Sequence, residues 1–313
     1  MPTIFSVTVP FFALILFGYV AARRRWVPPE SVPAFNGFLL FFAVPAMLFR
    51  FAAHTPFREI ANGRFFLAWS LAGVLVLLVV TIAARRLLRE STRNCAFFGL
   101  AASVSNSGFL GVPLIVALMG DRAAAPVILS IVADLVVAAS IGLLIAEMDG
   151  ATGRGWKQDL RDAVVRIALN PFVVSMLLGA MFSGFGWVLL APLDGIVKLL
   201  ADSAGPCALF AIGVSLVRPD ATLRSPTLAL PVVAKLLLHP LAVWAAMRGF
   251  AIEGFTARAA VLTAALPSAG WVFIFATRYE ADAGRISAII LLTTALAFAT
   301  FSALAWFLGV GHG

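Results

Sequence analysis

The chain has 313 residues, of which 62% are hydrophobic and only 12% are charged, and its mean hydropathy is +1.01. A soluble domain of this length cannot bury so much apolar surface, so the composition excludes that class and predicts an all-α polytopic membrane protein. The net charge of +8 does not indicate a nucleic-acid partner, because the basic residues border apolar segments and serve to orient them in lipid.

Ten apolar windows of about 20 residues follow one another along the chain, each long enough to cross about 30 Å of hydrocarbon. We expect the first to be a retained span rather than a signal peptide, because its arginines follow the apolar run instead of preceding it. The windows are residues 3–22, 33–53, 65–84, 95–119, 126–146, 165–187, 194–217, 226–248, 257–277 and 286–309.

Positive charge is divided unevenly between the two sides of the predicted membrane. Cytoplasmic loops are enriched in Lys and Arg, so the loops after odd-numbered windows are predicted to be cytoplasmic and both termini non-cytoplasmic. The odd loops contain Arg23, Arg24, Arg25, Arg85, Arg86, Arg89, Arg93, Arg154, Lys157, Arg161, Arg218, Arg224, Arg278 and Arg285, and the opposite side contains Arg50, Arg58, Arg64, Arg122, Lys198, Arg248 and Arg258.

The fourth window contains a break in its helical pattern. The run NSGFLGVP, residues 106–113, combines an amide, two glycines and a proline within an apolar stretch. Proline removes a helix hydrogen bond, and glycine lets the backbone leave helical angles. In hydrocarbon each orphaned backbone group costs several kcal/mol, so a break persists only inside protein or beside water. A proline kink that serves packing is the alternative interpretation.

The later windows contain ionisable side chains. Asp134, near mid-depth in the fifth, is a candidate site for proton or cation coupling because burying its charge is costly; the alternative is a neutral, hydrogen-bonded core carboxyl. Asp202, in the seventh, could line a substrate route. Lys235 and His239, in the eighth, share one helix face. Lys235 could pair with Asp134 or attract an anion, but we favour a side chain that reaches the cytoplasmic surface, and a lone histidine is more often structural.

The ninth window has a second break, LPSAG, at residues 266–270. An offset of 161 residues places the second half of the chain on the first, for example Ser268 on Ser107 and Asp282 on Asp121. We therefore predict two inverted repeats of five spans each. These are residues 1–146 and 165–313, joined by a cytoplasmic linker at residues 147–164.

Broken helices at corresponding positions of two inverted halves are typical of a transporter substrate site. The first N–H groups of each half-helix would hold an anion, especially a carboxylate, while neutral side chains add donors and glycines permit close approach. The predicted substrate site comprises Asn106, Ser107, Gly108, Gly111, Pro113, Pro267, Ser268 and Gly270, and the candidates for ion coupling or charge are Asp134, Lys235, His239 and Asp202.

Three stretches resemble the auxin efflux carrier family. NSGFLGVPLIVALMG is similar to the family's fourth-helix motif, LFAIGVSLVRP to its Leu-Phe-x-x-Gly-x-x-Leu-x-x-Pro pattern, and LPSAGWVFIFATRY to its ninth helix with Phe-Ala-x-x-Tyr. The resemblance implies a ten-helix inverted-repeat fold, similar to that of bile-acid and sodium/proton transporters, in which helices four and nine cross beside the substrate. It identifies Asn106 as the crossover asparagine and Pro113 and Pro267 as the crossover prolines.

The resemblance also implies a scaffold of spans 1, 2, 6 and 7, through which members dimerise, and a transport unit of spans 3, 4, 5, 8, 9 and 10 that moves like an elevator. The plant members that export auxin have a long central loop. The linker in this chain is short, which favours the bacterial members, some of them described as carriers of malonate or other small carboxylates. The resemblance therefore implies a location in a bacterial inner membrane.

The sequence thus predicts a secondary carrier of a small organic anion, either a carboxylate such as malonate or an auxin-like aromatic acid, embedded in membrane lipid. A passive anion channel and a membrane sensor or interaction protein are the alternatives. We expect no enzyme, because the chain lacks a nucleophile elbow, a phosphate-binding loop and a His-Glu-x-x-His motif. We expect no metal and no cofactor, beyond a coupling proton or sodium ion.

Overall fold

The computed structural model describes residues 2–54, 62–148, 165, 169, 171–215, 217 and 226–310. Nearly all of the predicted linker at residues 147–164 lies outside this part of the chain. The described residues are helical and contain no strand; their one extended contact is an isolated antiparallel bridge between Ser105 and Ser268.

Six helical segments among the described residues are long and apolar enough to cross a membrane. They are Pro29–His54, Gly63–Leu88, Ala124–Glu147, Ala191–Ser215, Pro226–Gly249 and Ala283–Phe307. The other predicted windows also contain helix, but it is either short among the described residues or interrupted. The fourth and ninth windows are the interrupted ones, as the runs NSGFLGVP and LPSAG predicted.

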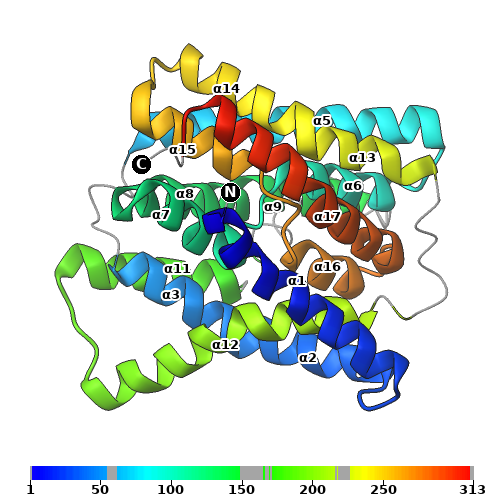
Figure 1. Ribbon diagram of the computed structural model, residues 1–313, viewed down its shortest axis with the longest axis horizontal. Coiled ribbons are helices and arrows are strands. Elements are labelled where there is room, and N and C mark those ends of the chain that lie inside the picture. Colours follow the sequence, from blue (N-terminus) through cyan, green and yellow to red (C-terminus); the bar gives the residue numbers. More distant parts are fainter. Residues whose placement is uncertain are drawn as a thin grey trace. The chain divides into compact units, whose positions relative to one another are not determined.

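The chain divides by its internal contacts into two compact units (Figure 1). The larger unit is built from the third, fourth, fifth, eighth, ninth and tenth windows. The smaller unit is built from the second, sixth and seventh windows and from the first window onward from Val9.

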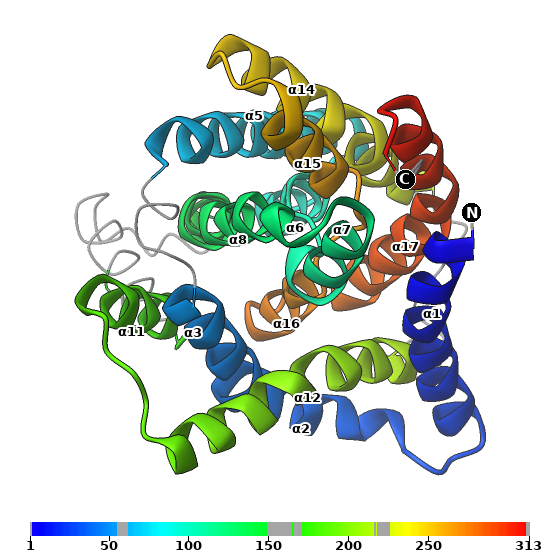
Figure 2. The same ribbon diagram turned by 60° about the vertical axis from the view of Figure 1, so that its left-hand side comes forward.

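The larger unit contains both interrupted helices. Its helix α6 lies in the middle of the unit, with α5 on one side and α17 on the other (Figure 2). Every residue of α6 from Cys95 to Ser103 is buried, as expected for a helix that is apolar all round. The α-helices of this unit are α5 (Gly63–Leu88), α6 (Thr92–Ser103), α7 (Val112–Met119), α8 (Ala124–Ala133), α9 (Ala139–Glu147), α13 (Ala229–Val233), α14 (His239–Gly249), α15 (Gly254–Ala264), α16 (Trp271–Arg278) and α17 (Ala283–Phe307).

Wide π-helical turns interrupt three helices of the larger unit, and each contains a buried polar residue. The turn η3 (Ser107–Gly111) precedes α7 and begins at Ser107. The turn η5 (Asp134–Ala138) joins α8 to α9 and begins at Asp134. The turn η8 (Ala234–Leu238) joins α13 to α14 and contains Lys235. Such single turns are frequent at functional sites.

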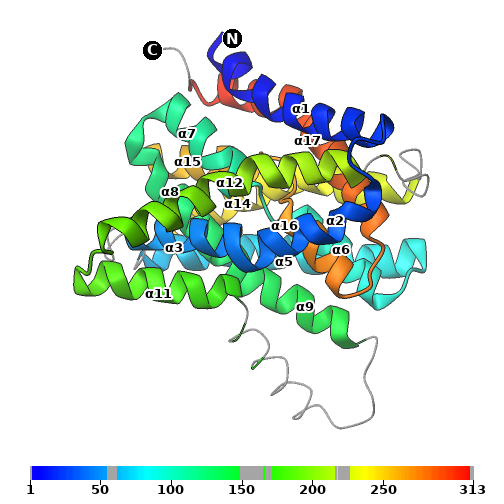
Figure 3. The same cartoon turned by 90° about the horizontal axis from the view of Figure 1, so that it is seen from below.

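The smaller unit is held by close contacts between helix backbones. Its helices are α1 (Pro2–Arg23) from Val9 onward, α2 (Val32–Phe38) and α3 (Val44–His54), with the π turn η2 (Leu39–Ala43) between the last two, and α11 (Pro171–Phe185) and α12 (Ala191–Ser215). Helices α3 and α11 run side by side (Figure 3).

Glycine permits two of these contacts. A Cβ added at Gly18 in α1 would lie 2.1 Å from the carbonyl oxygen of Phe210, and one at Gly179 in α11 would lie 2.4 Å from that of Phe49. The second pair is the first pair displaced by 161 residues, with the roles of the two halves of the chain exchanged.

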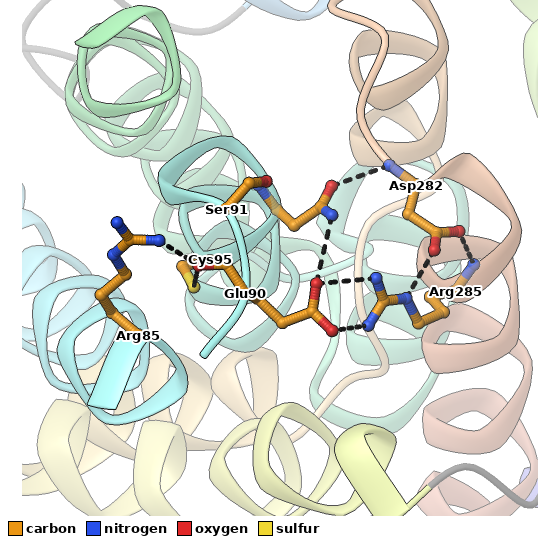
Figure 4. A network of polar contacts seen from close by, with 7 residues as sticks. Arg85, Glu90, Ser91, Cys95, Asp282 and Arg285 are labelled. Carbon is orange, nitrogen blue, oxygen red and sulfur yellow. Dashed lines mark hydrogen bonds and ion pairs between the residues drawn. The ribbon is translucent and has the colours of Figure 1, made fainter. Parts of the chain in front are cut away.

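An ion-pair network joins the start of α6 to the start of α17 (Figure 4). The Arg285 guanidinium donates to both carboxylate oxygens of Glu90 and, at 2.5 Å, to Oδ2 of Asp282. The Asn94 side chain accepts from the backbone N–H of Asp282 at 3.0 Å. The hydrogen bonds from Arg285 hold the pKa of Glu90 below its usual value. This network fixes two helix ends that are nearly 200 residues apart in the sequence.

Candidate functional site

The two interrupted helices meet at their breaks, residues 104–106 and 265–270, which we call the crossing segments. The backbone N–H of Asn106 donates to the carbonyl oxygen of Pro267 at 2.9 Å, and Ser105 and Ser268 form the antiparallel bridge beside this bond. Asn106 and Pro267 are themselves 161 residues apart, so the bond joins corresponding positions of the two halves. Because a residue before proline is disfavoured in the α region, α15 stops short of Pro267 and its chain is extended there.

The backbone of Asn106 is fully hydrogen-bonded, whereas its side chain is not. The Asn106 carbonyl oxygen accepts from the N–H groups of Leu110 and Gly111 at 3.1 and 2.9 Å. The carboxamide makes no cap bond to the following turn, and no hydrogen bond to it is found within the described part of the chain. The residue is nevertheless only 6% exposed. The carboxamide is not one of the fully enclosed polar groups that lack a partner, so a bound ligand could reach it and satisfy it.

The two serines of the predicted site are held by neighbouring helices. The Ser107 hydroxyl accepts from Ser130 Oγ in α8 at 3.2 Å. The Ser268 hydroxyl donates to the carbonyl oxygen of Ala101 in α6 at 2.6 Å, and its backbone N–H donates to Thr293 Oγ1 in α17 at 3.2 Å. The Ser268 hydroxyl proton is therefore already used within the protein.

The predicted glycines and prolines lie at or next to the breaks. Gly111 ends η3, and a Cβ added there would lie 2.8 Å from the Leu266 side chain, so its absence allows the two broken helices to pack closely. Gly270 is buried at the start of α16, and Gly108 is half-buried in η3. Pro267 is buried, and Pro113 is the second residue of α7.

Asp134 is tied directly to the break in the fourth window. Its Oδ2 accepts from the backbone N–H of Ser105 at 3.2 Å, and its Oδ1 accepts from Trp69 Nε1 in α5 at 2.7 Å. The side chain is 2% exposed. The carboxylate therefore holds the crossing segment at Ser105, one residue before the bond between Asn106 and Pro267.

Lys235 does not reach the membrane surface, so the expectation of a cytoplasmic side-chain end is wrong. The residue is 0% exposed, and its Nζ donates to Ser105 Oγ at 2.7 Å and to the Ala264 carbonyl oxygen at 2.9 Å. It also lies 2.8 Å from His239 Nδ1. The structure thus brings Lys235, His239 and Asp134 together around Ser105, as their positions in neighbouring spans allowed but did not require.

Asp202 is not part of this cluster. It belongs to α12 of the smaller unit, and its side chain is 61% exposed. Its carboxylate pairs with Lys198, four residues earlier on the same helix, at 2.7 Å.

Sequence reasoning missed four residues that hold the crossing segments, namely Trp69, Ser105, Ser130 and Thr293. Trp69 carried a usable signal, because a buried indole N–H needs a hydrogen-bond acceptor. The hydroxyl residues carried none, since Ser and Thr are common in membrane helices and usually bond their own backbone. Within the described residues, no group of three or more His, Cys, Asp and Glu side chains could hold a metal ion.

The comparisons with known proteins agree with one family. The family model described as "Membrane transport protein" matches residues 3–306. A protein of Rhizobium meliloti (strain 1021) named "Putative malonate transporter" is 32% identical, over 99% of this chain and 98% of its own length. "Uncharacterized transporter YfdV" of Escherichia coli (strain K12) is 25% identical over 87% of both chains. "Auxin efflux carrier component 8" of Arabidopsis thaliana is 24% identical over 94% of this chain and 95% of its own.

These matches extend over almost the whole chain and include the broken helices, and the members of this family are transporters rather than enzymes. With its several apolar helices, the chain is an integral membrane protein, and it belongs to the auxin efflux carrier family.

Proposed function

We propose that the protein is a secondary carrier of a small organic anion in a bacterial inner membrane. The observation that carries this proposal is the Asn106 carboxamide, which lies at the meeting point of two broken helices, is only slightly exposed and makes no hydrogen bond inside the described structure. Just after the crossing segments the helices restart, at η3 in the fourth window and at α16 in the ninth, and the first N–H groups of a restarted helix have no acceptor in a preceding turn. Together these neutral donors suit a carboxylate.

The reciprocal contacts support two inverted repeats and ten spans. In the larger unit, the bond between Asn106 and Pro267 joins equivalent positions. In the smaller unit, the contacts of Gly18 and Gly179 exchange the two halves of the chain. A two-fold relation between repeats produces this kind of exchange, and inverted repeats are typical of alternating-access carriers.

The division into two units supports an elevator-type movement. The larger unit contains both broken helices and the cluster of Asp134, Lys235 and His239, so it is the proposed transport unit. The smaller unit, with its backbone contacts at glycine, is the proposed scaffold and the proposed dimer surface. We also propose that both termini are non-cytoplasmic, because the odd-numbered loops contain more basic residues.

The names of the relatives indicate the class of substrate. One relative is named for malonate and another for auxin, and both compounds are organic acids that are anionic at neutral pH. The site we propose recognises what they share, which is a carboxylate, rather than the remainder of either molecule.

A thermal-shift screen of the purified protein against mono- and dicarboxylates and aromatic acids tests this proposal. A ligand that binds the folded state raises the melting temperature, so at least one acid should do so. The matching carboxamide removes the negative charge and should give a much smaller shift. Equal shifts from an acid and its amide would contradict recognition by half-helix N–H groups.

Counterflow in proteoliposomes separates a carrier from a passive pore. Vesicles preloaded with unlabelled acid should transiently accumulate labelled acid, and the initial rate should saturate with external concentration. Uptake that rises linearly with concentration and shows no counterflow would identify a pore and exclude alternating access.

A further inference from the structure

Lys235 occupies a closed cage of polar atoms inside the larger unit. Its Nζ lies 2.7 Å from Ser105 Oγ, 2.8 Å from His239 Nδ1 and 2.9 Å from the Ala264 carbonyl oxygen, and the residue is 0% exposed. An ammonium group has three N–H donors and no acceptor. The cage supplies three acceptors, one for each donor.

The protonation state of His239 is consistent with a charged lysine. If Nδ1 accepts from the ammonium, the ring proton must lie on Nε2. His239 Nε2 is buried without a hydrogen-bond partner, and the ring packs edge-on against Trp69 with centroids 5.6 Å apart. In this tautomer the histidine is neutral, and it contributes no second positive charge to the cage.

The cage lies at the C-terminal end of a half-helix. Ala264 is the last residue of α15, and its carbonyl oxygen is one of the last four, which lack helical donors. The negative end of the helix dipole lies there as well. In carriers with broken helices, such C-terminal ends and unwound carbonyls bind the coupling cation. In this chain a covalently attached cation fills the position.

The charge of the cage is balanced by one carboxylate. Asp134 accepts the backbone N–H of Ser105, while Lys235 donates to the hydroxyl of the same residue. No direct ion pair joins the two side chains among the described residues, so Ser105 lies between them. Burying either charge alone would be strongly unfavourable, whereas the pair is neutral overall.

We propose that the Lys235 ammonium is a built-in monovalent cation that permanently fills the cation site at the end of α15. The larger unit therefore binds no sodium ion at this position. The consequence for transport, which rests on the proposed function, is that uptake does not depend on sodium.

Chemical rescue of Lys235→Gly, which removes the complete butylammonium side chain, tests the proposal without any transport substrate. The variant has an empty channel shaped like a butylammonium group, and Asp134 has lost its counter-charge. The melting temperature should fall, and n-butylammonium should restore about half of the loss or more, because it binds only the folded state. n-Butanol, which has the same chain and no charge, should restore little.

Two controls accompany this measurement. Leu236→Ala removes a buried side chain from the same turn without touching the cage, so n-butylammonium should not restore its stability. The wild type should have the same melting temperature in sodium chloride and in choline chloride of equal ionic strength. Equal rescue by butanol and butylammonium, or a sodium-dependent melting temperature in the wild type, would overturn the proposal.

A second pair of variants decides the question if Lys235→Gly does not fold. Lys235→Met keeps the length of the side chain and removes only its charge. If the ammonium balances Asp134, then Asp134→Asn should stabilise the Lys235→Met protein although it destabilises the wild type. A destabilising effect in both backgrounds would contradict charge balance.

Different results would contradict the proposed function and this inference. A protein that binds no carboxylate but shows selective rescue by n-butylammonium would retain the built-in cation and lose the anion-carrier proposal. Carboxylate binding without selective rescue by n-butylammonium would support the anion carrier and contradict the built-in cation.

Discussion

At the scale of single residues, the side chain of Asn106 and its backbone have separate roles. The backbone closes the contact with Pro267, whereas the carboxamide has no partner in the described structure. Substitutions that spare the backbone should therefore affect ligand binding more than folding.

Asn106→Ala should weaken carboxylate binding by about tenfold or more, because a hydrogen bond to a charged group contributes about 1.5–3 kcal/mol. The melting temperature without ligand should stay close to that of the wild type. Titration calorimetry with an acid identified in the screen measures the first effect. Unchanged affinity in a folded variant would remove Asn106 from the substrate site.

Residue patterns predicted some of this site and not the rest. Asn106 and Pro267 were found because breaks in apolar runs are visible in sequence, and Asp134 because a charge in a span is rare. Ser105 was missed although it contacts both Asp134 and Lys235, since a serine in a membrane helix is not distinctive. Contacts between distant helices leave no local pattern.

At the scale of elements, the helix spacing of Lys235 was read correctly and its surroundings were not. Lys235 and His239 share a helix face and lie 2.8 Å apart, as their spacing of four residues predicts. The expectation of a surface position failed because Ser105 and Ala264, which come from two other windows, supply acceptors inside the unit. The spacing of residues along one helix does not reveal acceptors on its neighbours.

Helix contacts at glycine should not tolerate even one methyl group. Gly18→Ala and Gly179→Ala each place a Cβ against a backbone carbonyl that cannot move independently of its helix. Overpacking should cost about 1–3 kcal/mol in each case. Gly37→Ala in α2 meets nothing within 4 Å and should be neutral or slightly stabilising. Equal melting temperatures for the three variants would refute this account of the contacts.

The network between α6 and α17 should make stability depend on pH in the acidic range. Because the pKa of Glu90 is lowered in the folded state, its contribution is fully present above the unfolded value of 4.5 and is lost as the pH falls through the folded value. Glu90→Gln should therefore lower the melting temperature at pH 7, and the difference from wild type should shrink toward pH 4 and below. The exposed Glu253→Gln should show no such trend. A constant difference for Glu90→Gln would assign the effect to packing.

At the scale of the whole molecule, the sequence predicted the membrane class, the helical content and the two breaks. Composition and hydropathy suffice for these features, because lipid leaves few structural alternatives. Composition and hydropathy do not predict the two compact units, because each unit combines windows that are far apart in the chain. Only the family resemblance suggested that grouping.

Proton coupling by Asp134, the candidate found in the sequence, is a question about the whole transport cycle. A carboxylate that permanently balances Lys235 cannot also carry protons across the membrane, so Asp134→Asn should lower uptake into proteoliposomes at every pH and leave the shape of the pH profile unchanged. Glu30→Gln, at an exposed position in the smaller unit, should change neither the rate nor the profile. A pH profile that is flattened by Asp134→Asn alone would assign proton coupling to Asp134 and contradict a permanent charge balance.

The two crossing segments are held by chemically different side chains. Ser105 donates its backbone N–H to a carboxylate, that of Asp134, whereas Ser268 donates to a hydroxyl, that of Thr293. A protein assembled from two copies of the second half would hold both crossings with neutral hydroxyls and would have no fixed negative charge to offset a lysine. The two halves are therefore not interchangeable at the crossing, because only the first places a carboxylate there.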